Sequence, residues 1–592
     1  MRMSSSGDLA RDRRNLFAAP LIAALALVSS MTSIFNQFAY DDQYIIRLNP
    51  VVHTVRDWWT VFQNSYWPKE WGGDGYRPLT ILAFKLEWAL SGGKPWSFHA
   101  VNIALYAIVS VLVYLLARRI LPNWAAWITA ALFAVHPVHV EAVANVVGQS
   151  ELLVAAATLG AMLLYIRDRR QGDLRPTTIV LVAFLYAVGC CSKEHGIVLP
   201  ALLLACEVTV MDDAARLRSR LYAQRWLYLT LAAIAITFMS VRSAVLSDHA
   251  LGGFHPFVPF AALNITRTDR ILTALGVVPQ WVRLLYWPAH LSAEYGPPAI
   301  EIAQGPSVTQ LPGLIVLVAI LAVGVLARRR NPIIALGVAF TCITLLPSSN
   351  FVLPAGIIIA ERTLFLPSVG AMLIVGAVAG YAASVAQRRA SMRTFAIVGG
   401  SMCAALLAIG ALRSARRSRV WYDSETVFRQ SIVDAPLAYR AHFMLGAWAF
   451  EHQRQREGER ELRQALKLFP YDPFVALDLA ENYRELNRCP AAIPLFRSII
   501  GPNKNFPLGR TGFAICLLET GSYAEAKERA TDAIEAGGDT VSLRRIISLA
   551  DSMIAVRHGR ASATDVSLPG VPSKVPETVQ KTAETTPAPG RK

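Results

Sequence analysis

Charged side chains recur where the apolar segments of this sequence end, and the first of them is an acidic pair. Asp41 and Asp42 stand between Tyr40 and Tyr44 in FAYDDQY, directly after the first apolar block. One carboxylate, held ionised and aimed by its neighbours, can act as a general base while the other orients an acceptor. The alternative is a pair of ordinary loop acids. The adjacency of the two acids and the flanking tyrosines favour the catalytic interpretation.

Three cations lie at comparable positions further along the chain. Arg77 occurs in GYRPLT, Lys193 in CCSKEHG and Arg362 in AERTLFLPS. Cations near several carboxylates can hold a phosphate leaving group, and arginine adds a bidentate fork. An interfacial anchor with a snorkelling stem is an equally good explanation for each. The sequence leaves this choice open.

Five further polar residues at segment ends are predicted to bind the donor sugar or its phosphate: His136, His139, Glu141, Glu194 and Glu361. A closed zinc site needs three or four ligands at defined spacing, which HPVHVEAV matches only weakly. Helix capping explains the two histidines as simply, and hydrogen bonds to a sugar or to the acidic loop are the preferred role. We therefore predict no metal site and no cofactor, and leave a divalent-metal requirement open.

The elements that must position these residues are membrane helices. Of the 592 residues, 54% are hydrophobic and 17% are charged, a balance too apolar for a soluble core. The apolar residues form blocks near the ~20 residues that span ~30 Å of hydrocarbon. The sequence thus predicts an all-α, polytopic transmembrane helix bundle. Its roughly eleven spans are 16–36, 97–117, 124–140, 146–166, 177–190, 195–211, 226–245, 309–327, 332–347, 363–383 and 395–412.

Basic clusters give the orientation. With the N-terminus inside, Arg118-Arg119, residues 167–170 and Arg328 to Arg330 all fall on the cytoplasmic side. The cluster from Arg413 to Arg419 disagrees, because it would lie outside. All candidate site residues then gather at the external face, which argues against a transporter with polar groups at mid-membrane. These clusters explain the net charge of +16. The sequence has no basic stretch interleaved with aromatic residues, so it does not predict nucleic-acid binding.

Two further segments are not expected to be regular spans, 271–290 although it is apolar and 43–92 because it is too polar. Residues 271–290 would reverse the side of Arg328 to Arg330 if they crossed, so a re-entrant or interfacial element is expected. Residues 43–92 contain WW, YW and EW pairs, which suit an external loop lying against the membrane surface. The seven cysteines lack CxxC or His-rich spacing and are expected to be packed thiols.

The C-terminal part repeats with a period of 34 residues. Gly446, Ala480 and Ala514 are 34 apart (480−446 and 514−480), and each follows a bulky side chain. Two more registers of small or apolar residues keep the same spacing. Small residues at this period are typical of tetratricopeptide repeats, in which paired helices cross closely. An ordinary helical bundle is the less favoured alternative. Beyond about residue 562 the chain is rich in Pro, Thr and Lys and is predicted to be disordered.

The candidate residues also carry a family resemblance. The order FAYDD, YRPLTILAFKL, HPVHVEAVANVVGQSELL, SKEHGI, VRLLYWPAHLS and SSNFVLPAGIIIAERTLFLPSVG, followed by the repeats, is similar to the transmembrane and tetratricopeptide-repeat-containing protein O-mannosyltransferases. The resemblance runs from about residue 30 to 540, and HPVHVEAV and AERTLFLPS are its specific blocks. The repeat array is shorter than in the long animal members.

The resemblance implies a GT-C membrane fold, a polyprenyl-phosphate-linked hexose donor, typically mannose, and a protein hydroxyl acceptor. It also implies an essential acid in the first external loop, which maps onto Asp41 or Asp42. The expected domains are a cytoplasmic N-terminus (1–15), a GT-C-like transmembrane catalytic domain (16–412), a linker (413–436), tetratricopeptide repeats (437–560) and a disordered tail (561–592).

The expected function is transfer of a hexose to Ser or Thr hydroxyls of a protein. The expected partners are the lipid-linked sugar, an acceptor protein that docks on the repeats, and the bilayer. The expected location is a bacterial inner membrane with periplasmic repeats, or an endoplasmic reticulum membrane with lumenal repeats. A non-catalytic membrane scaffold that displays repeats for protein binding is the alternative.

Overall fold

The computed structural model describes residues 6–54, 56–71, 73–211, 216–246, 258–388, 391–500, 509–535 and 540–558. Every regular element in these ranges is helical, so the predicted all-α class is confirmed. The chain divides into two compact units, Met1–Ala441 and His442–Lys592. Each unit is described by itself.

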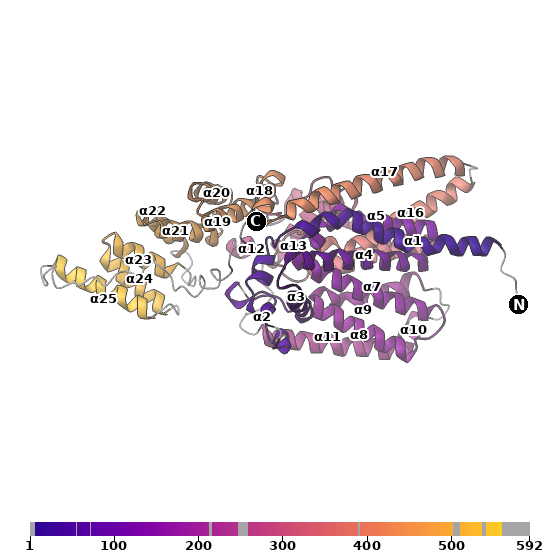
Figure 1. The fold of residues 1–592 in the computed structure, drawn as a ribbon, viewed down its shortest axis with the longest axis horizontal. Coiled ribbons are helices and arrows are strands. Elements are labelled where there is room, and N and C mark those ends of the chain that lie inside the picture. The colour runs from indigo at the N-terminus through magenta and orange to yellow at the C-terminus, as the bar shows by residue number, and fades with distance from the viewer. Residues whose placement is uncertain are drawn as a thin grey trace, which may run out of the picture. The chain divides into compact units, whose positions relative to one another are not determined.

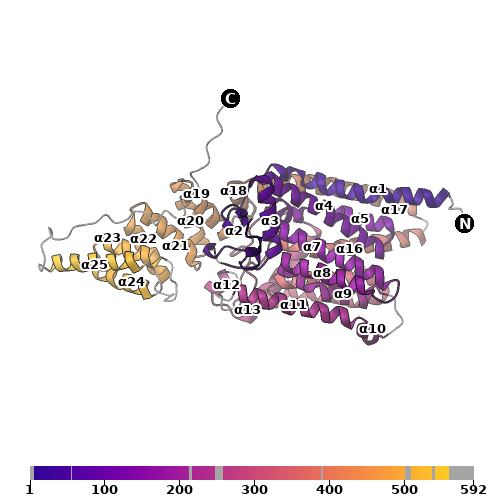
Figure 2. The same ribbon diagram turned by 60° about the horizontal axis from the view of Figure 1, so that its bottom comes forward.

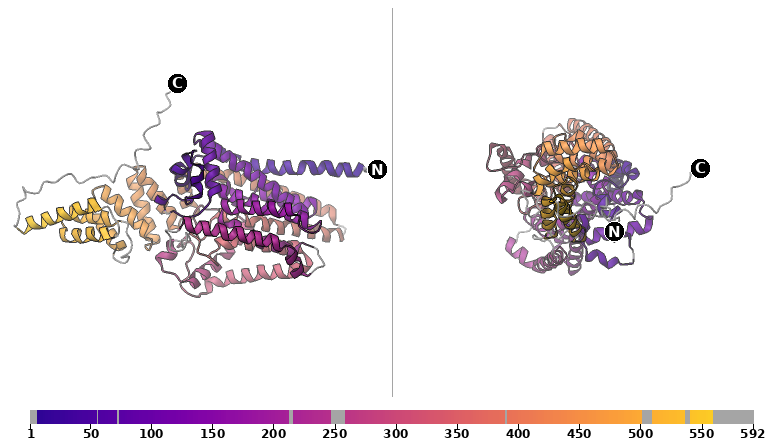
Figure 3. Two further views of the ribbon diagram at one scale, coloured as in Figure 1. Left: turned by 90° about the horizontal axis from the view of Figure 1, so that it is seen from below. Right: turned by 90° about the vertical axis from the view of Figure 1, so that its left-hand side faces the viewer.

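The first unit is a bundle of helices that run side by side along one direction (Figures 1 and 3). Each of the eleven predicted spans coincides with one of its helices, since apolar blocks of this length fold into helices that satisfy their own backbone groups. These helices are α1 (Ser6–Ser30), α4 (Pro95–Ile120), α5 (Asn123–Ala134), α7 (Gln149–Arg169), α8 (Pro176–Ser192), α9 (Leu199–Thr209), α11 (Arg225–Val245), α14 (Leu311–Arg330), α15 (Pro332–Leu345), α16 (Pro367–Arg388) and α17 (Met392–Ser418).

Not all of these helices are long enough to cross a bilayer. Among the described residues, seven helices are long and apolar enough, and an eighth span results if α5 and Pro137–Ala144, bent by 47°, count as one. The predicted spans at 177–190, 195–211 and 332–347 fall on α8, α9 and α15, which have 17, 11 and 14 residues. At ~1.5 Å per residue, each is shorter than ~30 Å. Eleven spans therefore remain a prediction.

The two ends of the bundle differ. The short helices α2 (Pro50–His53), α3 (Pro78–Ser91) and α12 (Val258–Ala262) lie at one end, which we call the site end (Figures 1 and 2). The start of α1 and α10 (Leu217–Ala223) lie at the other end. Helices α4, α7 and α14 run away from the site end, and each of them finishes in a basic turn. The basic turn that ends α17 lies at the site end instead, beside the loop after α1, and the orientation stays a prediction.

The two segments that were not expected to be regular spans are both helical. Residues 43–92 form five helical pieces around buried Ile46, Val52 and Phe84. Trp58 and Trp59 of this segment are 54% and 56% exposed, as an interfacial surface requires. Residues 271–290 lie mostly in α13 (Arg267–Tyr286), which begins with a capping box at Thr266 and is not among the seven long apolar helices.

Close backbone contact between α15 and α16 fixes part of the site end. A Cβ atom on Gly370 would lie 2.4 Å from the Gly337 carbonyl oxygen, and one on Gly337 would lie 2.7 Å from the Gly370 carbonyl oxygen. The two helices therefore touch where both residues lack a side chain. This crossing holds the start of α16 and with it the preceding turn η10 (Glu361–Leu364).

The C-terminal helices keep the predicted period. They are α19 (Tyr439–Glu451), α20 (Gln455–Leu468), α21 (Pro473–Glu485), α22 (Cys489–Ile500), α23 (Arg510–Glu519), α24 (Tyr523–Glu535) and α25 (Thr540–Arg557). Three pairs of equivalent helices begin 34 residues apart (473−439, 489−455 and 523−489). A Cβ atom on Gly446 would lie 2.8 Å from Leu462 Cγ, so these helices do cross closely at a small residue. The tetratricopeptide assignment stays a prediction that this period supports.

The expectations for the linker, the cysteines and the C-terminal tail have three different outcomes. The expected linker is helical: α17 continues to Ser418, η11 covers Arg419–Trp421 and α18 covers Ser424–Asp434, with Trp421 buried. Cys489 and Cys516 form a disulfide, so the expectation of packed thiols is wrong for these two. A separation of 27 residues carries no local motif, and only the packing of α22 on α23 brings the sulfurs together. The predicted disordered tail lies outside the described residues.

Candidate active site

The two adjacent aspartates have different environments. Asp42 is fully buried, and its carboxylate accepts backbone N–H groups from Ala39 at 3.3 Å, Val146 at 3.2 Å and Val147 at 2.9 Å. Burial raises the pKa of Asp42 to about 7, although these three donors lower it. Both of its oxygens are occupied by the backbone. Asp42 therefore fastens the loop after α1 to the turn η6 (Val146–Gly148) before α7.

Asp41 keeps an accessible carboxylate. Its side chain is 14% exposed, and its Oδ2 atom lies 3.3 Å from Arg362 Nη2. Burial raises the pKa of Asp41, and the neighbouring Arg362 guanidinium opposes that shift. Of the pair, Asp41 is the aspartate that a substrate can reach.

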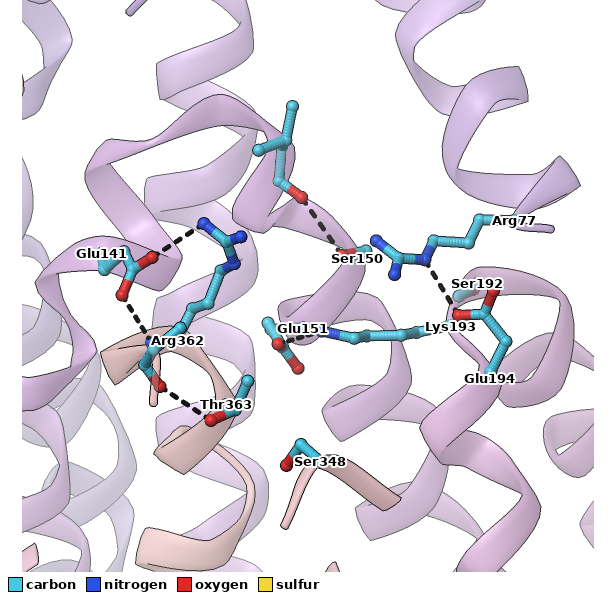
Figure 4. Close-up of polar contacts among 12 residues, drawn as sticks. Arg77, Glu141, Ser150, Glu151, Ser192, Lys193, Glu194, Ser348, Arg362 and Thr363 are labelled. Atoms are coloured by element: carbon cyan, nitrogen blue, oxygen red, sulfur yellow. Dashed lines mark hydrogen bonds and ion pairs between the residues drawn. The ribbon is translucent and has the colours of Figure 1, made fainter. Parts of the chain in front are cut away.

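Arg362 joins two carboxylates at the site end, Glu141, which Figure 4 shows, and Asp41. Its Nη1 atom lies 2.8 Å from Glu141 Oε1, and its backbone N–H donates to Glu141 Oε2 at 2.9 Å. Because Nη2 faces Asp41, the planar guanidinium links η10 to the loop after α1 and to α6 (Val140–Ala144). Sequence alone predicted both Arg362 and Glu141 as site residues but not that they pair.

Arg77 is aligned by Glu194. Arg77 Nε lies 3.0 Å from Glu194 Oε2, and the Tyr76 N–H donates to Glu194 Oε1 at 2.8 Å. The guanidinium carbon lies 4.4 Å from the centre of the Tyr66 ring. Although burial raises the pKa of Glu194, Arg77 and the Tyr76 N–H lower it to about 2. Within the described ranges no acceptor contacts the two terminal nitrogens of Arg77, so these can serve a ligand.

Lys193 pairs with Glu151 in the first turn of α7, and both side chains are almost completely buried. Burial lowers the pKa of Lys193 to about 8 against the effect of Glu151, and the charges of Arg77 and Arg362 lower it further. The three cations are thus close enough to act on one another, and Figure 4 shows them around Glu151. Sequence reasoning missed Glu151. An acid in the first turn of an otherwise apolar helix was the available signal.

The predicted histidines lie apart from these ion pairs. His139 uses both ring nitrogens, on the Tyr106 hydroxyl at 3.0 Å and on Ser368 Oγ at 2.8 Å. His136 accepts the Val138 N–H at 3.3 Å and contacts the Leu285 carbonyl at 3.1 Å. Their hydrogen bonds join helices inside the bundle. No group of three or more side chains suited to a metal ion occurs in the part of the chain that the structure describes.

Glu361 also faces away from its neighbour Arg362. Its Oε1 atom accepts the Ser292 N–H and the Tyr295 hydroxyl, both at 2.6 Å. Burial raises the pKa of Glu361 to about 8. The side chain therefore binds the loop after α13. The structure brings together Asp41, Glu141, Arg362, Arg77, Glu194 and Lys193, and it does not bring His136, His139 or Glu361 into the same set of ion pairs.

Fold and site together define a polytopic, all-α membrane protein whose bundle carries carboxylate–cation pairs at one end. A family profile described as dolichyl-phosphate-mannose-protein mannosyltransferase matches residues 77–243, which contain Arg77, Glu141, Glu151, Lys193 and Glu194. The chain is similar to Protein O-mannosyl-transferase TMTC3 of Mus musculus, with 28% identity over 79% of this chain and 53% of that protein.

Two further relatives agree. Protein O-mannosyl-transferase TMTC1 of Homo sapiens is 27% identical over 76% of this chain and 55% of its own length. Protein O-mannosyl-transferase Tmtc2 of Drosophila melanogaster is 31% identical over 50% of this chain and 31% of its own length. The chain spans about half the length of the first relatives that it matches. The predicted resemblance to the transmembrane and tetratricopeptide-repeat-containing O-mannosyltransferases is confirmed.

Proposed function

We propose that this chain is a membrane glycosyltransferase that moves a hexose, with mannose expected, from a polyprenyl-phosphate carrier to a Ser or Thr hydroxyl of a protein. The observation that carries the proposal is the partly exposed Asp41 carboxylate, held by Arg362 beside Arg77 and Lys193. The printed names of the relatives and of the matching profile support the reaction class.

The reaction is one in-line displacement. Asp41 accepts the proton of the acceptor hydroxyl as the hydroxyl oxygen forms a bond to the anomeric carbon. The bond from that carbon to the phosphate oxygen breaks, and the electron pair leaves with the lipid phosphate. Inversion at the anomeric carbon follows because base and leaving group stand on opposite sides of the sugar.

Arg77 is the best-placed phosphate ligand, because Glu194 occupies only its Nε and aligns the fork. Lys193 and Arg362 add positive charge that stabilises the leaving phosphate. The three cations contact four carboxylates, namely Asp41, Glu141, Glu151 and Glu194, so the site carries no surplus positive charge before the donor binds. These seven protein groups sum to −1 (three cations against four carboxylates), and protonation of Asp41 brings their sum to zero while the leaving phosphate keeps its own negative charge.

The proposed site of action is the periplasmic or lumenal face. The basic turns after α4, α7 and α14 lie at the end of the bundle opposite to the site end, as expected for the cytoplasmic side, whereas the basic turn of α17 lies at the site end. The Cys489–Cys516 disulfide supports an oxidising compartment for the C-terminal helices.

The test is transfer of labelled mannose from a polyprenyl phosphate into the protein of membrane vesicles that contain the full chain. We expect Asp41→Asn to lower the rate by roughly 10²–10⁴. Asp57→Asn is the matched control, because Asp57 is an exposed acid of the same external segment. If Asp41→Asn transferred sugar at the parental rate, Asp41 would not be the general base. A parental chain that transfers no sugar would favour the scaffold alternative.

A further inference from the structure

The residue before Asp41 has an unusual backbone. Tyr40 adopts φ +57°, a left-handed conformation that costs a non-glycine residue about 1 kcal/mol or more. Such a conformation persists only where the surroundings enforce it. The Tyr40 ring is buried and lies edge-on to Trp421 at 6.0 Å and against Phe428 at 5.9 Å between ring centres. The strain is therefore held by the helices that follow α17.

The loop that leads to Asp41 is fastened along its length. Thr32 donates to the Ala415 carbonyl at 2.8 Å, Asn36 to the Ser418 carbonyl at 3.0 Å, and the Gln37 N–H to the Tyr422 carbonyl at 2.7 Å. The Tyr40 N–H donates to Ser424 Oγ at 3.0 Å. The end of α17 and the start of α18 thus form one wall of the Asp41 loop.

The Tyr40 side chain continues this wall through two charged residues. Its hydroxyl donates to Glu294 Oε1, and Glu294 Oε2 lies 3.3 Å from Arg440 Nε. Glu294 is 8% exposed at its side chain, and its backbone N–H is bound by Ser292 Oγ. Arg440 is the second residue of α19 and belongs to the first compact unit. These three residues come from three separate segments and meet beside the loop of Asp41.

We propose that Tyr40, Glu294 and Arg440 are positioning residues that hold the Asp41 carboxylate in place against Arg362. Their role in turnover rests on the function proposed above. Their action on Asp41 is independent of the proposed function, because the contacts exist in the protein without substrate. Sequence reasoning did not find Glu294 or Arg440, since neither stands beside a predicted span end with a recognised motif.

The electrostatic effects of the two charged members have opposite signs. Burial raises the pKa of Asp41 and Arg362 lowers it, and then Glu294 raises it while Arg440 lowers it. The titratable and charged groups that face Asp41 are Arg362, Glu294, Arg440, Arg77, Glu141, Tyr40, Tyr66 and Asp42. Removing two nearby charges of opposite sign should therefore shift the pKa of Asp41 in opposite directions, which reports that both groups lie close to this carboxyl group.

The experiment measures Asp41 directly. In the full chain in vesicles, the infrared carboxyl signal that disappears in Asp41→Asn is titrated against pH. We expect Glu294→Gln to move this titration to lower pH and Arg440→Gln to move it to higher pH, each by about half a unit or more. The acid limb of the transfer rate should move in the same two directions. Arg429→Gln is the control, because Arg429 forms an exposed i,i+4 pair with Glu425 in α18.

Tyr40→Phe tests positioning without a change of charge. It keeps the ring on Trp421 and removes the hydroxyl bond to Glu294, so we expect the maximal rate to fall about 10- to 100-fold with an unchanged donor KM. Titrations that shift in the same direction in Glu294→Gln and Arg440→Gln, or in neither, would overturn the proposal, as would a parental rate in Tyr40→Phe. If the parent transfers no sugar, the function fails while the infrared titration still decides whether Glu294 and Arg440 act on Asp41.

Discussion

Asp41 and Asp42 illustrate how one peptide bond separates a carboxylate that a substrate can reach from one that the backbone occupies. Asp42 points into the bundle, where three backbone N–H groups surround its oxygens, while Asp41 points to Arg362. The left-handed Tyr40 stands immediately before them. Adjacent acids in a sequence are interchangeable until the backbone turn between them is known.

Asp42→Asn should destabilise the protein rather than abolish chemistry directly. An amide offers one acceptor where the carboxylate offers two oxygens, so its NH₂ group would face a backbone donor inside the protein. A buried donor without an acceptor costs about 1–3 kcal/mol. Thermal unfolding of the purified protein should show a lower Tm for Asp42→Asn than for Asp57→Asn. An unchanged Tm would mean that Asp42 does not anchor the loop.

Arg77→Lys should weaken donor binding although the charge is kept. Lysine cannot hold Glu194 and present a planar fork at the same time. Losing a charge-assisted hydrogen bond of about 1.5–3 kcal/mol should raise the donor KM roughly 10- to 100-fold. Arg47→Lys, at an exposed arginine of the same external segment, is the control for the measurement with labelled polyprenyl-phosphate mannose. Equal donor dependence in Arg77→Lys and the parent would exclude the fork.

The site was predicted as a set of residues, not as a set of pairs. Charge avoids hydrocarbon, so charged residues at span ends are visible in the sequence and gather at one face. Which cation meets which acid depends on helix rotation and depth, and hydropathy contains neither. Glu151 was hidden because it lies inside an apolar block, and His139 was overvalued because its partners, Tyr106 and Ser368, come from distant segments.

At the scale of elements, the site depends on how closely neighbouring helices approach. Hydropathy located the eleven apolar helices of the bundle, because each apolar block needs its own backbone hydrogen bonds, but it did not locate the short helices α2, α3, α10 and α12. The predicted spans at 177–190, 195–211 and 332–347 are themselves short, with 14, 17 and 16 residues (190−177+1, 211−195+1 and 347−332+1), and α8, α9 and α15 have 17, 11 and 14. Hydropathy did not indicate the direct contact of α15 with α16, which needs glycines aligned on both helices.

Gly370→Ala should loosen this contact and displace Arg362. The added methyl group would meet the Gly337 carbonyl and the Thr341 side chain at distances below 3.0 Å, so the helices must separate. Overpacking of this kind costs about 1–3 kcal/mol. Gly380→Ala in the same helix is the matched control, because its methyl group would meet nothing within 4 Å. We expect a lower Tm and slower transfer in Gly370→Ala alone; equal values in both variants would contradict a glycine-dependent crossing.

At the scale of the whole molecule, orientation connects the proposed chemistry to a compartment. An odd number of crossings from a cytoplasmic start ends outside, and the helix lengths leave the number of crossings open. The disulfide between α22 and α23 is an independent indication, because cytosolic thiols are kept reduced. The orientation can therefore be tested without counting spans.

The last prediction is that Cys489 and Cys516 are oxidised in the cell and that the C-terminal helices face the periplasm or lumen. A maleimide-linked polymer should modify these two cysteines in denatured protein only after reduction, and Cys489→Ser with Cys516→Ser should abolish that reduction-dependent shift. Closing a loop with a sequence separation of 27 should stabilise these helices by about 3–4 kcal/mol, so the double variant should also unfold at a lower temperature. A compartment-sensitive reporter fused after about residue 430 should be active outside the cytoplasm. Reduced cysteines together with a cytoplasmic reporter signal would reverse the orientation, and the proposed active site would then face the wrong compartment for a periplasmic or lumenal transfer.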